Sequence, residues 1–422
     1  MRAFRSLANP NYRLWAAAGL LSNVGTWMQR TGQDWLVLAE LTRHSATAVG
    51  WVMALQFGPQ IVLLPLTGFA ADYFDRRKLL LVTQVLTAIL AASLGVLTVT
   101  HLVREWHVYV FALLLGCVSA FDAPARQTFV SDVVGEGDLG NAVALNSTSF
   151  NAARLVGPAA AGALVLAVGS GWVFLINAAS YLPVIAALVV LRKRLVTPSG
   201  PRVRPARGSF VEGFRYVWNR PDLKAMMAML FILCTFGLNF PIFIATMSVG
   251  VFHTHAGGFG LLSSVLAIGS VTGALMAARR AEPHVRFLLI GASVFALASV
   301  LAAVSPNELF FAGALVLVGL AAQTFTTSTN SLVQLRTEPA MRGRVVAILL
   351  AVSLGGTPIG APLVGWVADV FGPRWSLGVA AASGLAAAAV ALGYLIRHRG
   401  LRLSMIGARP VLQLTRQPSF EA

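Results

Sequence analysis

The sequence predicts an all-α membrane protein in which twelve transmembrane helices form two pseudo-symmetric six-helix bundles, and three observations carry this prediction. Hydrophobic residues make up 57% of the 422-residue chain and charged residues only 11%, whereas about a quarter of the residues in a soluble domain are charged. Apolar runs of about 20 residues, the length that crosses a bilayer as a helix, recur along the chain. A polar segment in the middle divides these runs into two sets.

Each apolar run is expected to be a helix, because only helices and closed barrels satisfy their backbone hydrogen bonds in lipid. Barrel strands would be about ten residues long with alternating polarity, and the runs here are longer and apolar throughout. The expected spans are 14–38, 46–70, 78–100, 106–127, 141–167 and 171–191 in the first half, and 223–249, 257–278, 285–304, 309–334, 344–368 and 374–396 in the second.

Segment 192–222 is the longest polar stretch between two spans. It is rich in proline, arginine and glycine, a composition that is typical of a linker because it cannot bury a core. We therefore expect a cytoplasmic basic linker at 192–222, between an N-terminal bundle at 1–191 and a C-terminal bundle at 223–396. Residues 397–422 are expected to form a cytoplasmic tail.

The distribution of basic residues predicts the orientation of the chain. The net charge is +16, and 27 of the 32 Lys and Arg residues lie in segments on the same side as the two termini. Short loops rich in Lys and Arg stay in the cytoplasm, so both termini are expected there, in a multi-pass protein of the cell (inner) membrane. A strongly basic chain can bind nucleic acid, but here the charges lie between apolar runs, and no nucleic-acid partner is expected.

The two halves contain matching residues at a constant offset. Small residues in the fifth and eleventh expected spans, and basic residues after the second and eighth, are 203 positions apart. The matched pairs are Gly157 and Gly360, Gly162 and Gly365, Arg76 and Arg279, and Arg77 and Arg280. Parallel repeats of this kind are a transporter architecture, in which the substrate site lies between the halves near the midplane of the membrane.

The loop between the second and third expected spans contains Gly68, Asp72 and the basic run 76–78. Glycine allows close helix approach, aspartate can lie at a helix N-terminus, and the basic run suits an anionic leaflet. The loop resembles the signature loop of the major facilitator superfamily, which implies a gating role for Gly68, Asp72 and the two arginines. It departs from the usual pattern at Tyr73, where the family has arginine, and at Asp75, where it has glycine.

The fifth expected span carries small residues four apart, from Ser149 through Gly157 to Ala161, followed by Gly162. Such a face lets a neighbouring helix pack closely, and Pro158 removes a backbone donor and bends the helix. This pattern resembles the glycine–proline signature of exporters in the superfamily. The resemblance implies that Gly157, Pro158 and Gly162 form a helix-packing motif, and it favours export over import.

Segments 34–50, 121–129 and 146–158 resemble the branch of the superfamily that contains the enterobactin exporter and macrolide-efflux carriers. The resemblance implies a secondary active transporter that exports a small amphipathic molecule, such as a drug, a secondary metabolite or a siderophore-like compound. It also implies alternating access driven by proton antiport. The alternatives are a lipid or lysolipid carrier or an importer of the same fold, and, less favoured, a polytopic membrane enzyme.

Ionisable residues inside expected spans are rare and are candidates for function. Arg30 and Asp34 are one helical turn apart and could pair with each other, and Asp122 could pair with Arg126. Arg154 is the most deeply embedded charge, and the two aspartates are the acidic candidates for proton coupling. The full set of substrate and proton-coupling candidates is Arg30, Asp34, Asp122, Arg154, Asn239 and Gln323.

Enzymatic chemistry is not expected. The seven histidines lie in loops or at helix ends, without the clustered nucleophile, base or metal ligands that catalysis in a membrane needs. Cys117 and Cys234 lie inside apolar runs, where cysteine acts as a small hydrophobe. We therefore expect no metal and no cofactor. The expected partners are a small-molecule substrate, protons and membrane lipids, and the chain is expected to be a monomer.

Overall fold

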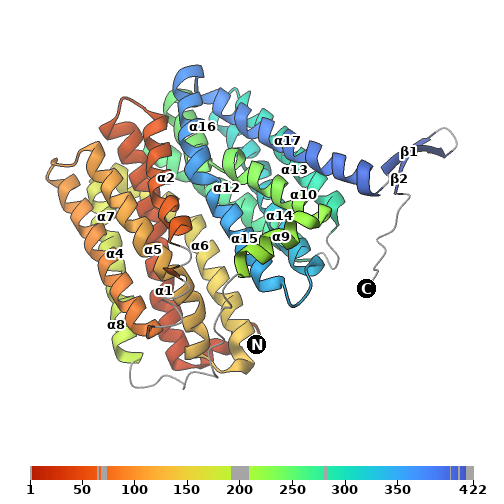
Figure 1. The fold of residues 1–422 in the computed structure, drawn as a ribbon. Coiled ribbons are helices and arrows are strands. Elements are labelled where there is room, and N and C mark those ends of the chain that lie inside the picture. The colour runs from red at the N-terminus through yellow and green to blue at the C-terminus, as the bar shows by residue number, and fades with distance from the viewer. Residues whose placement is uncertain are drawn as a thin grey trace.

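The computed structural model describes residues 2–63, 66–67, 74–191, 209–279, 284–399, 401–406 and 409–414. The chain folds into two helical bundles that lie side by side (Figure 1). One bundle is built from the N-terminal half of the chain and the other from the C-terminal half, with α9 and α10 beginning the second bundle.

The N-terminal bundle begins with a short 3-10 helix, η1 (Arg2–Ala8), and continues with long helices. These are α1 (Pro10–Trp35) with its π-helical extension η2 (Leu36–Leu41), α2 (Ala46–Val62), α4 (Arg76–Val99), α5 (Glu105–Val133), α6 (Glu136–Val168), α7 (Ser170–Ser180) and α8 (Leu182–Val190).

The C-terminal bundle is also helical, with a two-stranded hairpin after its last helix. Its elements are α9 (Ser209–Asn219), α10 (Pro221–Ile232), the π-helical η4 (Leu233–Gly237), α11 (Phe240–Gly250), α12 (Ala256–Ala278), α13 (Val285–Ala303), α14 (Glu308–Arg336), α15 (Arg342–Gly355), α16 (Thr357–Phe371), α17 (Pro373–Arg399), β1 (Leu401–Ile406) and β2 (Arg409–Leu414). The strands pair antiparallel, with Leu401 opposite Leu414.

The described residues contain ten helical segments that are long and apolar enough to cross a membrane. The chain is therefore a multi-pass membrane protein, and its bundles are all-α as predicted. The first two of the twelve expected spans are not among the ten. Helix α2 has 17 residues, and α1 carries several polar side chains, including Arg30 and Asp34.

Besides the first expected span, which passes from α1 into the π-helical η2 at Leu36, three expected spans are each divided by a break with a proline just after it. The span expected at 223–249 is broken after the π-helical η4, where Pro241 sits in the first turn of α11. In the span expected at 344–368, α15 ends and α16 begins at Gly356. In the span expected at 171–191, α7 ends and α8 begins at Tyr181. Each of the three breaks is followed by a proline in the first turn of the next helix, where the ring is tolerated because its missing N–H would have no partner in the helix.

Segments outside the spans also contain regular structure that hydropathy did not predict. Within the expected linker, 192–208 lies outside the described residues, while α9 is an ordered helix whose Glu212 forms a 3.1 Å ion pair with Arg344 of α15. The expected tail begins with the end of α17 and then forms the hairpin, an addition to the predicted all-α fold.

Capping side chains explain where several helices begin. The side chain of Asn9 accepts from the backbone N–H of Asn11 and Tyr12 at the start of α1. Asp75, at the position where the superfamily loop usually has glycine, accepts from the N–H groups of Arg77 and Lys78 at 2.9 and 3.1 Å. A carboxylate at the N-terminus of a helix satisfies donors that have no partner within the helix, so Asp75 sets the first turn of α4.

The repeated glycines occupy equivalent packing positions in the two halves. A Cβ atom on Gly157 would lie 2.6 Å from Cβ of Trp27 in α1, and one on Gly360 would collide with the carbonyl oxygen of Thr235 in η4. Both glycines thus pack on the first expected span of their own half, 14–38 and 223–249 respectively. Gly162 and Gly365 instead pack on backbone atoms of the opposite bundle, in α12 and α2 respectively.

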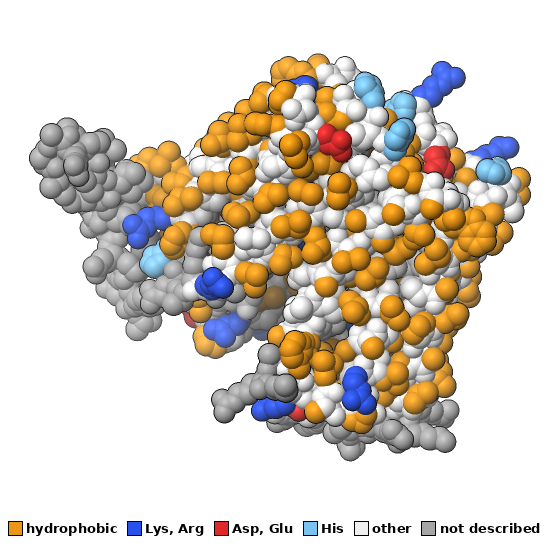
Figure 2. All heavy atoms as spheres, turned by 180° about the vertical axis from the view of Figure 1, so that it is seen from behind, with side chains coloured by type: hydrophobic (Ala, Val, Ile, Leu, Met, Phe, Trp, Pro, Cys, Tyr) orange, Lys and Arg blue, Asp and Glu red, His pale blue; other side chains and the backbone are white. Residues whose placement is uncertain are grey.

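The two bundles meet through α2 against α16 and α6 against α12. These contacts lie towards one end of the molecule, which we call the closed end, at the loops 42–45 and 251–255 and at Gly372. The N-terminus lies at the other end (Figure 1), where the surface is hollowed between the bundles (Figure 2). The structure is thus closed at one end and open at the end that carries the N-terminus.

Replacing Gly360 with alanine is expected to destabilise the fold, because the new methyl group would overlap the Thr235 carbonyl. Overpacking of this kind costs about 1–3 kcal/mol, and the midpoint of thermal unfolding in detergent should fall. The matched control is Gly313→Ala in α14, where an added Cβ meets no atom within 4 Å and helix propensity favours alanine. An equal midpoint for the two variants would contradict the packing assigned to Gly360.

Candidate functional site

A cavity of about 200 Å³ lies between the two bundles. The N-terminal bundle contributes a polar and charged wall, and the C-terminal bundle contributes a largely apolar wall. The first wall comprises Trp27, Arg30, Thr31, Gln33, Asp34, Met53, Gln56, Phe57, Arg154 and Pro158. The second comprises Leu238, Phe240, Pro241, Ile244, Phe259, Ser263, Leu266 and Thr357. Three of the four charged candidates, Arg30, Asp34 and Arg154, therefore share one cavity.

Trp27 organises the two arginines of the cavity. The guanidinium carbon of Arg30 lies 5.2 Å from the centroid of the Trp27 ring, and that of Arg154 lies 5.6 Å from the same ring. Arg30 also lies 5.6 Å from the ring centroid of Phe57. The negative face of an aromatic ring attracts a cation, so these rings offset part of the cost of keeping two positive charges close together in a membrane.

Helix α6 reaches this position because of its small residues. Gly157, one turn after Arg154, allows α6 to pack directly on α1 at Trp27. After Pro158, which has no N–H, the backbone N–H of Ala159 donates to the hydroxyl of Ser264 in α12 at 3.1 Å. The residues of the glycine–proline motif thus place Arg154 against α1 and join α6 to the other bundle.

The polar wall retains unused hydrogen-bonding capacity. Nε of Arg30 and both amide atoms of Gln33 are buried without a hydrogen-bond partner in the part of the chain that the structure describes. Asp34 is buried, and the pairing of Arg30 with Asp34 that the sequence left open is not among the ion pairs within 4 Å that the described residues form. Buried polar groups without partners are costly, so these groups are suited to bind a polar molecule that enters the cavity.

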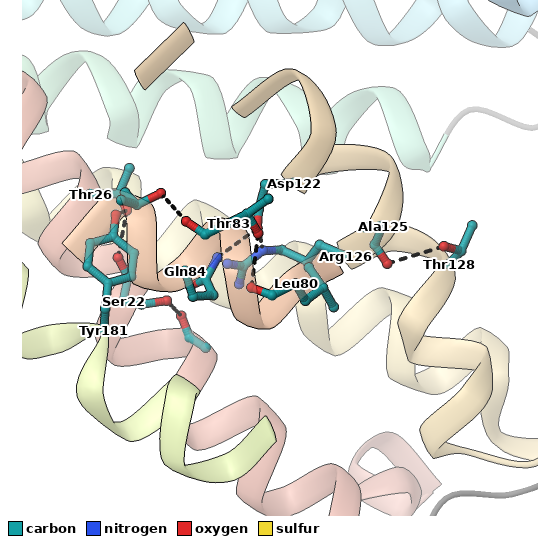
Figure 3. A network of polar contacts seen from close by, with 12 residues as sticks. Ser22, Thr26, Leu80, Thr83, Gln84, Asp122, Ala125, Arg126, Thr128 and Tyr181 are labelled. Atoms are coloured by element: carbon teal, nitrogen blue, oxygen red, sulfur yellow. Dashed lines mark hydrogen bonds and ion pairs between the residues drawn. The ribbon is translucent and has the colours of Figure 1, made fainter. Parts of the chain in front are cut away.

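Asp122 lies outside the cavity lining, in a network between α4 and α5 (Figure 3). Its carboxylate accepts from the Thr83 hydroxyl at 2.7 Å, from Nε2 of Gln84 at 2.7 Å and from Nε of Arg126 at 3.1 Å. The pairing of Asp122 with Arg126 considered from the sequence is therefore present. With three donors bound, this carboxylate connects two neighbouring helices of one bundle.

The two neutral candidates occupy different places. Asn239 lies at the break immediately before α11, between two cavity residues, Leu238 and Phe240, and its side chain makes no capping hydrogen bond to α11. It is fully buried, and its Nδ2 donates to the Thr235 carbonyl at 2.8 Å while Oδ1 has no partner among the described residues. Gln323 of α14 lies away from the cavity lining and donates to the Thr327 hydroxyl at 3.2 Å.

Apart from Pro158, the aromatic and apolar residues of the cavity were not predicted from the sequence. Trp27 and Phe57 resemble ordinary lipid-facing residues in sequence, because aromatic side chains are common in apolar spans. The spacing of Trp27 three residues before Arg30 was one available signal, since residues three apart share a helix face. Another was Pro241 within an apolar run, because discontinuous helices are typical of transporter binding sites.

The signature loop is described only in part. Gly68 and Asp72 lie outside the described residues. Arg76 forms a 3.0 Å ion pair with Asp132 of α5, and Arg77 donates from Nε to the backbone carbonyl of Leu188 in α8. The two arginines thus connect the start of α4 to the ends of two other helices of the N-terminal bundle.

Two helical bundles with matching packing positions and a cavity of mixed polarity between them define a membrane transporter of two related halves. More particularly, the chain belongs to the transmembrane secretion effector family of the major facilitator superfamily, whose model matches residues 1–404. It is therefore a transporter of small molecules and not an enzyme, and the superfamily expected from the signature loop is confirmed.

Curated relatives cover most of the chain at low identity. The staphyloferrin A transporter of Staphylococcus aureus (strain NCTC 8325 / PS 47) is 25% identical, over 84% of this chain and 89% of the relative. The multidrug efflux pump Tap of Mycolicibacterium fortuitum is 26% identical, over 84% and 88%. The enterobactin exporter EntS of Citrobacter koseri (strain ATCC BAA-895 / CDC 4225-83 / SGSC4696) is 25% identical, over 81% and 82%.

A solved structure has the same fold. A bacterial homologue of the human lysosomal transporter Spinster, in an inward-facing and occupied conformation, superimposes with a TM-score of 0.72 at 15% identity. The match covers 91% of this chain and 96% of that one. At this identity the likeness concerns the fold, and it agrees with the arrangement of the two bundles.

Arg154→Ala is expected to reduce the rate of transport about tenfold or more. The guanidinium is positioned to donate hydrogen bonds to a molecule in the cavity, and a hydrogen bond that involves a charged group contributes about 1.5–3 kcal/mol. The measurement is the initial rate of uptake into inverted vesicles, divided by the amount of folded protein. Arg154→Lys keeps the charge but not the planar donor fork, and it should recover only part of the rate. If Arg154→Ala instead lowers the amount of folded protein and leaves the rate per folded molecule unchanged, Arg154 has a structural role.

Asp122→Asn is expected to lower stability and to leave the transport rate per folded molecule within about twofold. The substitution removes the charge that Arg126, Thr83 and Gln84 surround, at a cost of about 1–3 kcal/mol, so the unfolding midpoint should fall. Thr83→Val removes one of the three donors and should produce a smaller fall. A large loss of rate at normal stability would place Asp122 in the transport mechanism.

Proposed function

We propose that this chain exports a small amphipathic molecule from the cytoplasm across the cell (inner) membrane, by alternating access and in exchange for protons. The observation that carries the proposal is the cavity between the bundles, which combines two arginines and one aspartate with an apolar wall. An N-terminal bundle at 1–191 and a C-terminal bundle at 223–396 move relative to each other around this cavity, with the linker at 192–222 between them and α9 of that linker packed on the C-terminal bundle.

The distribution of charge supports the orientation. Of the 32 Lys and Arg residues, 27 lie on the side of the termini, which the positive-inside rule assigns to the cytoplasm. With both termini there, the hollow between the bundles faces the cytoplasm and the closed end faces outwards. A cavity open to the cytoplasm is the state in which an exporter binds its substrate, and export is also the direction in the names of two relatives.

The asymmetric walls support an amphipathic substrate. Arg30, Gln33 and Arg154 offer donors to the polar part of the molecule, while Phe240, Phe259 and the aliphatic residues beside them cover its apolar part. Drugs and siderophore-like compounds combine these properties, and relatives are a staphyloferrin A transporter and a multidrug efflux pump. Because a single chain supplies both walls, a monomer is sufficient for transport in the lipid bilayer.

Asp34 is the group we assign to proton coupling. Among the described residues it is the carboxylate that lines the cavity, whereas the Asp122 carboxylate already binds three donors. A carboxylate within the membrane is a typical proton carrier. The ionised Asp34 accepts a charge-assisted hydrogen bond from the substrate, and a proton on this carboxylate removes the negative charge and leaves one weaker carbonyl acceptor, so proton binding and substrate binding weaken each other.

Other candidates have supporting roles in this proposal. Gly68, Asp72, Arg76 and Arg77 form the gating loop at the cytoplasmic end, and the last two already connect α4 to its neighbours. Gly157, Pro158 and Gly162 maintain the close packing of α6. Asn239 lies at the break in the seventh expected span, where its unpaired Oδ1 becomes available if α11 moves, while Gln323 is farther from the substrate.

Asp34→Asn is expected to abolish accumulation against a gradient while substrate binding changes by less than about tenfold, because the amide retains one acceptor but binds no proton. The measurement compares transport with and without a pH gradient in inverted vesicles. Asp122→Asn is the matched control and should retain the response to the gradient. Uphill, protonophore-sensitive export by Asp34→Asn would contradict the role of Asp34.

A panel of compounds tests the substrate and the direction. Staphyloferrin A, enterobactin, neutral and cationic drugs and a lysolipid are each added outside inverted vesicles, and accumulation inside is followed with and without a protonophore. Accumulation of a drug or siderophore that collapses with the protonophore supports proton-coupled export. Preference for the lysolipid would favour a lipid carrier, and uptake only in right-side-out vesicles would favour an importer.

A further inference from the structure

The carboxylate of Asp369, near the end of α16, binds the first turn of α2 in the opposite bundle. It accepts from the backbone N–H of Ala46 at 2.7 Å and of Thr47 at 2.9 Å. It also accepts from the hydroxyls of Thr47 at 2.6 Å and Ser45 at 3.1 Å. Four donors from one short segment thus converge on one side chain that lies more than 300 positions away in the sequence.

This contact is electrostatically favourable and belongs to one conformation. The N-terminus of a helix carries a partial positive charge and free N–H groups, and hydrogen bonds to an ionised acceptor are stronger than neutral ones. Because Asp369 and α2 belong to different bundles, the four bonds exist only while the bundles meet at the closed end. Any movement that separates α2 from α16 there breaks all of them together.

The matching contact in the other half lacks this feature. The residue 203 positions before Asp369 is Leu166 of α6, which meets the first turn of α12 at Gly257. The backbones approach as closely on both sides, since a Cβ on Gly50 would lie 2.5 Å from the Ala361 carbonyl and one on Gly260 would collide with the Pro158 carbonyl. The packing is therefore shared by the two interfaces, and the carboxylate is specific to the α2–α16 interface.

We propose that Asp369 is a latch that holds the closed end shut, by capping α2 across the bundle interface. Its role is to set the ratio of molecules closed at this end to molecules open at it, and it positions helices without touching the substrate. The latch requires only that the bundles separate here during transport. The latch proposal therefore does not depend on the proposed direction of transport, the substrate or the proton coupling.

Spin-label distances test the latch without a substrate. Labels are attached to cysteines at Arg43 and His255, exposed residues on opposite bundles at the closed end, after the two natural cysteines are replaced with alanine. The wild-type pair should show mainly one short distance. In Asp369→Asn, one carboxylate oxygen is replaced by an amide N–H₂, which cannot accept from the donors of α2, and the negative charge is lost. The ratio of molecules with the longer label distance to molecules with the short one should therefore rise by about tenfold.

A second variant keeps the test valid if Asp369→Asn folds poorly. Thr47→Val removes one of the four donors with little change in shape and should produce a smaller shift in the same direction. Because both changes affect one contact, adding Thr47→Val to Asp369→Asn should cause no further shift. The control is Glu40→Gln, which alters a carboxylate that accepts from Ser170 within a single bundle, and it should leave the distances unchanged.

Two results would overturn the latch. One is a distance distribution in Asp369→Asn that matches the wild type. The other is an effect of Thr47→Val that is equally large with and without Asp369, because side chains that act separately give additive effects.

Discussion

Backbone contact between the two bundles at the closed end is the constraint on which the rest of the structure depends. Helices α2 and α16, and α6 and α12, approach so closely that glycine is needed at Gly50, Gly162, Gly260 and Gly365. Apolar side chains gain little by leaving lipid for a protein interface, so helices in a membrane associate through close packing and interhelical hydrogen bonds. These contacts bring the bundles together at one end and leave the cavity and the hollow beyond it.

The charged residues of the cavity are costly to bury, and part of that cost is offset by aromatic rings. Two arginines in a membrane interior are expensive, and here Trp27 and Phe57 lie against them. The remaining polar capacity, at Arg30 and Gln33, is unused among the described residues. A transporter needs such capacity, because a site already satisfied by the protein would have little to offer a substrate, whereas Asp122, with three donors, is suited to a structural role.

Much of the fold could be predicted from the sequence, whereas the site could be predicted only in part. Hydropathy predicted the helical class, and the 203-residue offset anticipated the equivalent packing of Gly157 with Gly360 and of Gly162 with Gly365. Depth in an apolar run identified Arg30, Asp34 and Arg154, which do share a cavity. Polar residues in the same kind of run were also selected at Asp122, Asn239 and Gln323, which are not among the residues that line it, because position along one helix contains no information about the direction of a side chain in the bundle.

The sequence by itself determined that this protein crosses the membrane many times, in two related halves with a strong asymmetry of positive charge. These properties depend on the composition and spacing of local segments, which lipid selects without reference to the rest of the fold. Only the tertiary structure decided which side chains face one another. The Trp27 ring beside both arginines, the donors around Asp122 and the contact of Asp369 with α2 join helices from distant parts of the chain. Such contacts arise when helices pack, and packing depends on the shapes of all neighbouring helices together.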